Sequence, residues 1–393
     1  MKKRLTVLLI LVLVCVGIFA LGSMVANAAE GEDEINQSIS DLLSELDLSE
    51  LQQYLDKHKD SYLFNFGNTA GEIIEYLVHG NLGTDYGGYI SELFTIIFRN
   101  VISLIPAFAE ITAISLLSAI VSSAEGNLMG KSTSKIIHLA CYSLIILILA
   151  SMLTGIVSDC ISCINTVKKQ IEIITPILAT LTVLTGGTGT AAIYQPSAIF
   201  LSGGAVEIVS GFIFPATIAV IVLNFMSKLN TQMSFSGVTA FVKSIMKWVI
   251  GITVTVFSIF ITMQSSASSL FDGIIFKATK YVVSNSVPIV GNFLSSGFDM
   301  LTSAGLLIKS SVGVCGIILL LMELIEPIIV LAAFSLILKL VGAIVQPIGE
   351  NVLYSLLSDL SKDIEYFIAG LLTVAFMYAL VVMLIINSAN SFL

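Results

Sequence analysis

The chain has 393 residues, of which 56% are hydrophobic and only 11% are charged, and its formal net charge is −9. Soluble domains carry about 25% charged residues, so this composition excludes an ordinary soluble protein. Long apolar runs recur along the chain, for example "FIAGLLTVAFMYALVVMLII". An α-helix needs about 20 such residues to cross a bilayer. The sequence therefore predicts an all-α fold, namely a polytopic α-helical integral membrane protein.

Residues 1–28 have the form of a secretory signal peptide. Three basic residues open the segment, an apolar run follows, and the segment ends in Ala26-Asn27-Ala28. Small residues at such positions are typical of a cleavage site. We therefore expect cleavage after Ala28. The alternative is an uncleaved first membrane helix, because the apolar run is long for a signal peptide.

Residues 29–88 are interpreted as a small helical head outside the cytoplasm. From residue 29 to residue 100 the chain has 14 acidic and three basic residues. Lys and Arg hold loops on the cytoplasmic side, so an acidic segment after a signal peptide is expected on the other side. The negative charge also argues against binding of nucleic acid.

The head is predicted to consist of short helices that need support. "DLSE" at 47–50 and "TAGE" at 69–72 have the spacing of helix N-terminal caps. About 60 residues without a cysteine give a thin core for an independent domain. We therefore expect the head to lean on the membrane, on a partner or on copies of itself.

Residues 89–393 are predicted to form the membrane domain, with an internal repeat. Lys131 and Lys135 in "KSTSK" align without gaps with Lys243 and Lys247 in "KSIMK", at an offset of 243 − 131 = 112 residues. The apolar runs that follow also coincide. The proposed units cover about 131–242 and 243–350, after a partial earlier unit and before a terminal helix at 365–387.

The prolines extend the same alignment. Pro176 aligns with Pro288 and Pro215 with Pro327, while Pro106 marks the partial earlier unit. We interpret all five as helix kinks or helix starts. If both lysine pairs are cytoplasmic, the units are parallel repeats related by an axis along the membrane normal.

The four lysines have two interpretations. They are cytoplasmic anchors that fix the topology, or they dock a cytoplasmic partner or anionic lipid head groups. Between the two crossings of the first unit lies a Gly-rich stretch, residues 185–204, which either lines a watery cavity or lies at the outer interface.

No enzyme motif is present, so we expect neither catalysis nor a cofactor nor a metal site. The sharpest polar feature is Glu323 and Glu326, which share a helix face just before Pro327. They form a pore lining, a proton-coupled site or an interhelical contact. The alternative is the external turn of a helical hairpin whose second helix starts at Pro327. Glu110 and Glu207 have the same two interpretations.

The segment "FKATKYVVSNSVPIVGNFLSSGFDML", residues 276–301, together with the signal peptide, the acidic head and the polytopic body, resembles the stage III sporulation protein AE family of endospore-forming Firmicutes. The resemblance covers essentially the whole chain. It implies a subunit of the channel complex that links the mother cell and the forespore, in the mother-cell membrane that surrounds the forespore.

The implied partners are the lipid bilayer, other proteins of the stage III sporulation A operon (including a cytoplasmic ATPase and ring-forming subunits), and a forespore-side channel partner. Self-association into a homo-oligomer is a further expectation. The implied role is permease-like or that of a channel platform. The alternatives are a self-contained secondary transporter that couples protons through Glu323 and Glu326, and a purely structural tether.

Overall fold

The computed structural model describes residues 32–57, 69–79, 86–123, 131–189, 191–192, 203–229, 234–286, 291–348 and 351–387. Every element within these ranges is a helix. The predicted signal peptide lies outside the described residues, and so does Pro288.

Three helices are far longer than a bilayer is thick. α6 (Lys131–Leu184), α9 (Ser236–Ser286) and α10 (Gly291–Val345) have 54, 51 and 55 residues. At 1.5 Å per residue they extend for about 75–85 Å, against about 30 Å for the hydrocarbon core of a membrane. The remaining long elements are α5 (Tyr86–Ser123), α8 (Phe214–Leu229) with the π-helix η2 (Val209–Ile213) before it, and α11 (Asn351–Asn387), which follows the 3-10 turn η3 (Gln346–Ile348).

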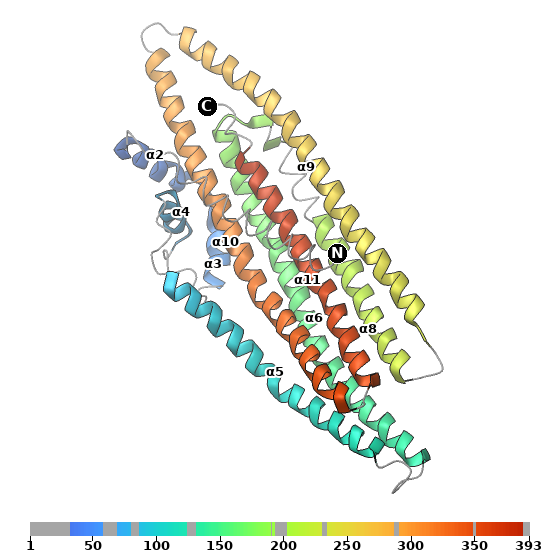
Figure 1. The fold of residues 1–393 in the computed structure, drawn as a ribbon. Helices are drawn as coiled ribbons and strands as arrows, with labels where there is room; N and C mark the ends of the chain where they lie inside the picture. The colour runs from blue at the N-terminus through green and yellow to red at the C-terminus, as the bar shows by residue number, and fades with distance from the viewer. Residues whose placement is uncertain are drawn as a thin grey trace.

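The centre of the molecule consists of α6, α10 and α11, which lie side by side (Figure 1). α10 runs antiparallel to α11, because the hydroxyl of Ser335 lies 3.1 Å from that of Ser361 while Tyr378 Oη donates to Gly316 O at 3.0 Å. Glycine permits this close approach, since a Cβ at Gly316 would lie 2.7 Å from Tyr378 Oη. Below, the end where α6 and α9 begin is called the lower end and the end where α10 begins the upper end.

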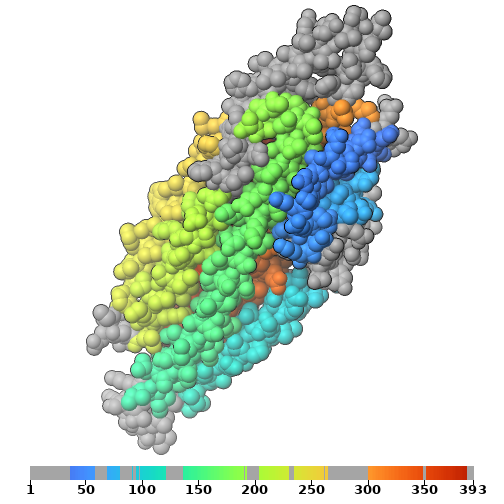
Figure 2. All heavy atoms as spheres, turned by 180° about the vertical axis from the view of Figure 1, so that it is seen from behind, coloured from blue at the N-terminus to red at the C-terminus, as the bar shows by residue number. Residues whose placement is uncertain are grey.

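Three short helices, α2 (Glu32–Glu45), α3 (Ser49–Lys57) and α4 (Ala70–Val78), pack against the upper parts of α10 and α6 (Figures 1 and 2). Their apolar side chains are buried in the same core as those of the long helices. The head therefore leans on the long helices, as its thin core requires.

The two predicted caps have different outcomes. The cap at Thr69 is confirmed, because its side chain accepts a hydrogen bond from the Glu72 amide. The cap at Asp47 is displaced: α3 starts two residues later, and Asp47 Oδ1 accepts from Ser49 N at 3.1 Å and from Ser49 Oγ at 2.6 Å. The Asp47 carboxylate therefore precedes the helix and caps no amide of its second or third position.

Large exposed apolar side chains are concentrated in the lower half of the bundle. We define the apolar belt by these exposed side chains, which lie within Phe94–Ile120 of α5, Ile136–Ile161 of α6, residues 212–229 of η2 and α8, Val238–Met263 of α9 and Leu336–Ile344 of α10. On α5, α6 and α9 the belt is about 38–39 Å long, close to the thickness of a bilayer. We therefore take the belt as the surface that faces lipid.

The upper half of α10 is apolar for a different reason. Of its 19 residues from Thr302 to Leu320, 15 are buried and four are partly buried, in the part of α10 that packs against α6, α11 and the head. Six helices within the described residues are long and apolar enough to cross a membrane, but the candidate spans on α6 and α10 have 49 and 46 residues. The upper half of each of these two spans lies beyond the belt and contributes buried side chains to the protein core.

The Gly-rich stretch begins where α6 ends. Gly186 has a φ of 88°, its amide donates to Val183 O, and the amide of Gly187 donates to Thr182 O. This pair of hydrogen bonds is a Schellman motif, which requires the left-handed conformation that glycine adopts without strain. Residues 193–202 of this stretch lie outside the described residues.

The internal repeat stays a prediction. α6 and α9 both start at the lower end, and α8 and α10 both run back toward it (Figure 1). The helix boundaries do not coincide at the offset of 112 residues, however. The helix that contains Pro215 begins at Gly203, which corresponds to residue 315, whereas α10, which contains the counterpart Pro327, begins at Gly291.

Candidate functional site

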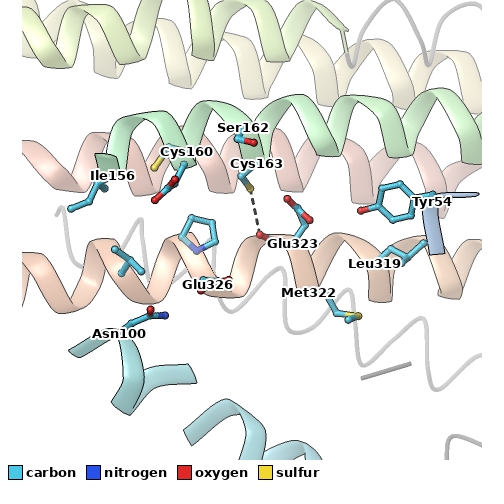
Figure 3. Close-up of a pocket in the computed structure, with 13 residues that line it drawn as sticks. Tyr54, Asn100, Ile156, Cys160, Ser162, Cys163, Leu319, Met322, Glu323 and Glu326 are labelled. Carbon is cyan, nitrogen blue, oxygen red and sulfur yellow. Dashed lines mark hydrogen bonds between the residues drawn. The ribbon is translucent and has the colours of Figure 1, made fainter. Parts of the chain in front are cut away.

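A cavity of about 470 Å³ lies between α3, α5, α6 and α10, at the upper edge of the apolar belt (Figure 3). It is the place where the head meets the long helices. Its lining is polar in a chain that is otherwise apolar: three carboxylates, a phenol, an amide and a serine hydroxyl. These polar groups belong to Asp159, Glu323, Glu326, Tyr54, Asn100 and Ser162.

Glu323 and Glu326, the predicted pair, both line this cavity. Glu323 is half-buried, whereas Glu326 is exposed. Glu326 Oε1 lies 3.4 Å from Arg99 Nη2 of α5, and the two side chains are 56% and 63% exposed. Because both partners are solvated, this ion pair contributes little to stability. Glu326 is therefore available to other cationic groups.

α10 continues without a break through Pro327, so the interpretation of the pair as the turn of a hairpin is wrong. A proline has no amide hydrogen, which releases the carbonyl four residues earlier from its helical bond. That carbonyl belongs to Glu323, and Cys163 Sγ of α6 donates to it at 3.5 Å (Figure 3). α6 thus supplies a hydrogen-bond donor in place of the amide N–H that residue 327 lacks.

Tyr54 of α3 closes the cavity from the side of the head. Gln170 Nε2 of α6 donates to its hydroxyl oxygen at 2.6 Å, and Figure 3 shows that hydroxyl directed toward the carboxylate of Glu323. Burial raises the pKa of Tyr54 to about 12, opposed by the hydrogen bond from Gln170 and assisted by the negative charge of Glu323. The phenol therefore stays neutral at physiological pH.

Sequence reasoning did not identify Asp159, Asn100 or Tyr54 as parts of this site. Asp159 is an exposed carboxylate beside the "CISC" motif, whose cysteines Cys160 and Cys163 are buried and free. The one sequence signal that could have identified Asp159 was its charge within an apolar helix. With three carboxylates in its lining and one arginine paired with Glu326 beside it, the cavity attracts basic groups. No group of His, Cys, Asp and Glu within the described ranges could hold a metal ion.

A sequence profile described as stage III sporulation protein AE (spore_III_AE) matches residues 68–389 of the chain. The chain belongs to the stage III sporulation protein AE family. The "Stage III sporulation protein AE" of Bacillus subtilis (strain 168) is 22% identical over 396 residues, which cover 99% of this chain and 98% of that protein. No solved structure matches the chain.

The other predicted acidic residues of this family member do not join the cavity. Glu110 is exposed on α5, within the apolar belt. Glu207 is exposed one turn before Gly211 of η2, and a Cβ at Gly211 would lie 3.3 Å from its Oε1. Neither residue lines the site that holds Glu323 and Glu326.

The predicted lysines are placed differently from one another. Lys131 begins α6, and the side chains of Lys131 and Lys135 lie outside what the structure describes. Lys247 is exposed on α9, whereas Lys243 Nζ lies 2.5 Å from the fully buried Asp363 Oδ1 of α11. Lys243 therefore forms an internal contact that the sequence did not reveal, and the interpretation of the four lysines as topology anchors stays a prediction.

The four predicted prolines that the structure describes lie inside helices. Pro106, Pro176 and Pro327 are internal to α5, α6 and α10, and Pro215 follows the π-helix within the continuous helix Gly203–Leu229. None of these four begins a helix, and their role as kinks stays a prediction. Two of these prolines lie near the cavity. Pro327 lines it, and Pro106 lies two helical turns below Arg99 on α5.

Proposed function

We propose that the chain is a non-enzymatic membrane component of the channel or secretion-like complex that links the mother cell and the forespore, with a scaffold or permease-like role. Membership of a sporulation family supports a sporulation role. The observation that carries the rest is the division of the bundle into two zones. The lower half presents an apolar belt to lipid, and the upper half extends beyond it as a protein core to which the head is attached.

The two zones favour a platform over a self-contained membrane protein. From Glu326 to the start of α10 there are 35 residues, which extend about 50 Å beyond the upper edge of the belt. A helical projection of this length offers a large protein surface outside the bilayer. The proposed partners are other proteins of the stage III sporulation A operon, including its ATPase on the cytoplasmic side and its ring-forming subunits on the head side.

The charges near the lower end indicate the orientation. Basic residues cluster on cytoplasmic segments of membrane proteins. Of the 12 lysines in the membrane domain, seven lie in the lower parts of the helices (Lys131, Lys135, Lys228, Lys243, Lys247, Lys339 and Lys362), and five lie above the belt on the side of the acidic head (Lys168, Lys169, Lys277, Lys280 and Lys309). We therefore assign the lower end to the mother-cell cytoplasm and the acidic head to the space between the two membranes.

Labelling of single cysteines with a membrane-impermeant maleimide in intact cells tests this orientation. Cysteines at Ser132 and Ser244 should be protected, and a cysteine at the exposed Tyr76 of α4 should be labelled. Permeabilised cells provide the control, in which all three should react. Labelling of Ser132 and Ser244 from opposite sides would refute both the orientation and the parallel repeat.

The cavity supports one alternative, a secondary transporter that couples protons through Glu323 and Glu326. A Glu323→Gln/Glu326→Gln variant separates the two functions. In a transporter this variant loses coupled uptake while the complex still assembles. In a scaffold it either keeps normal spore formation or fails to co-purify with its partners. Glu110 lies outside the cavity, so the Glu110→Gln variant serves as the matched control.

A further inference from the structure

α9 is attached to the bundle by a narrow seam. It lies at the edge of the molecule (Figure 1), and its large apolar side chains at 241, 248, 252, 256, 259, 260 and 263 are exposed. The buried positions within its described side chains are Thr239, Met246, Thr253 and Phe257. Successive steps of seven, seven and four residues are the pattern of a heptad seam.

Lys243 lies within this seam, between Thr239 and Met246. Its Nζ is 2.5 Å from Oδ1 of Asp363, and the exposed fractions of the two side chains are 21% and 0%. The other carboxylate oxygen, Oδ2, accepts from Asn224 Nδ2 of α8 at 2.6 Å. One buried carboxylate of α11 therefore holds both α8 and α9.

A second contact joins α9 to α8 at nearly the same height along the bundle. Thr217 Oγ1 of α8 lies 3.5 Å from Met246 Sδ, one turn above Lys243. α8 is itself tied to α11, because Lys228 Nζ donates to Ser355 Oγ at 2.6 Å and lies 3.7 Å from Asp359 Oδ2. α8 and α11 thus form a fixed pair against which the position of α9 can be measured.

Apolar contacts alone select this position poorly. Lipid tails are as apolar as the side chains of the seam, so burial gives little net attraction between helices in a membrane. A heptad seam also matches its partner again after a slip of seven residues, about 10 Å along the axis. A buried charge, in contrast, is satisfied at only one axial position, and a mismatch leaves it unpaired.

We propose that the Lys243–Asp363 pair sets the axial register of α9 on α8 and α11. Lys243 and Asp363 are positioning residues: they select one placement of a helix whose apolar seam permits several. The register also sets the position of the C-terminal end of α9 relative to the start of α10, because α9 continues as one helix to Ser286. This inference is independent of the proposed function.

Disulfide crosslinking in native membranes tests the register directly. Thr217→Cys is combined in turn with Met246→Cys, Thr239→Cys or Thr253→Cys, and copper phenanthroline drives oxidation. With Lys243 and Asp363 intact, only the Met246→Cys pair should crosslink efficiently. Variants with one introduced cysteine control for the native cysteines, which are buried.

Two backgrounds then separate register from stability. Lys243→Met leaves a buried carboxylate unpaired and is expected to reduce folding. Lys243→Met/Asp363→Leu removes both charges, and replacing a buried ion pair by apolar residues of similar volume is often neutral or stabilising. In the double variant we expect the Met246→Cys crosslink to fall by about threefold or more, with new crosslinks at Thr239→Cys or Thr253→Cys, one heptad away.

The matched control is Lys339→Met, because Lys339 pairs with Glu365 at 4.0 Å while 56% exposed. It should leave the crosslink pattern unchanged. If Lys243→Met/Asp363→Leu keeps the single Thr217→Cys–Met246→Cys crosslink at its original yield, apolar packing sets the register and the proposal is overturned.

Discussion

Cys163 of α6 donates to the carbonyl oxygen of Glu323 at 3.5 Å, the group that Pro327 leaves without its helical donor. A thiol on one helix thus compensates for a proline on another, at the level where the bundle leaves the apolar belt. This contact satisfies the carbonyl that Pro327 releases inside the continuous helix α10.

The Cys163→Ala variant should be less stable than the native protein, by about 1 kcal/mol, because a buried carbonyl loses a donor. Cys163→Ser should retain most of the stability, since a hydroxyl donates to the same oxygen. Thermal unfolding of the protein in detergent, followed by circular dichroism, measures both. Equal stability of the Ala and Ser variants would show that the thiol acts by packing alone.

Stability should fall as pH rises from about 10 to about 12, and Tyr54 should account for part of that fall. Its pKa is raised from 10.0 to about 12 in the folded protein. In this window the unfolded state has released the proton and the folded state has kept it, so rising pH favours unfolding. The measurement is the midpoint of thermal unfolding at a series of pH values.

Tyr54→Phe is the control for the pH dependence, because it cannot ionise. Its midpoint should depend less steeply on pH above 10 than that of the native protein. At neutral pH the same variant should lose about 1 kcal/mol, since Gln170 Nε2 loses one of its two acceptors and keeps Leu319 O at 3.3 Å. Identical slopes for the two proteins would contradict the assignment.

Gly316→Ala should destabilise the packing of α10 on α11 by about 1–3 kcal/mol. The new Cβ would lie 2.7 Å from Tyr378 Oη and displace the hydroxyl from the carbonyl that it binds. Gly155→Ala on α6 is the matched control, because a Cβ there meets nothing within 4 Å. The control should stabilise the helix by about 0.5–1 kcal/mol, so the two substitutions should move the unfolding midpoint in opposite directions.

Arg99→Ala should change the free energy of unfolding by less than about 1 kcal/mol, because its ion pair with Glu326 is solvent-exposed. High salt should reduce the effect further. Chemical denaturation at low and high salt measures both. A loss of several kcal/mol that is insensitive to salt would mean that the pair is shielded from water, as by a bound partner.

The sequence was sufficient for the helical class and for the polar pair, because Glu323 and Glu326 interrupt an apolar tract. It was not sufficient for the lengths of the helices. Apolar side chains face lipid in the lower part of α10 and fill a protein core in its upper part, and hydropathy does not distinguish the two environments. The expected 20-residue crossings are therefore segments of longer helices.

Asp363 was missed for a related reason. It lies in "SDLSKDIEYF", where charged residues on both sides suggest a solvated segment. Only the packing of α8 and α9 shows that this carboxylate is buried while its neighbours Lys362 and Glu365 are about half-exposed. For the same reason the sequence did not reveal that Lys243, predicted as an anchor, also pairs with this carboxylate.

The unbroken course of α10 has a mechanical consequence. The same rigid rod is embedded in lipid at one end and carries the head near its middle, so the membrane-embedded part acts as the short arm of a lever. With about 50 Å of helix above the belt, a tilt of about 5° in the bilayer displaces the far tip by about 4 Å. A force applied at the lower end is thereby transmitted along α10 to its upper tip without any loop having to rearrange.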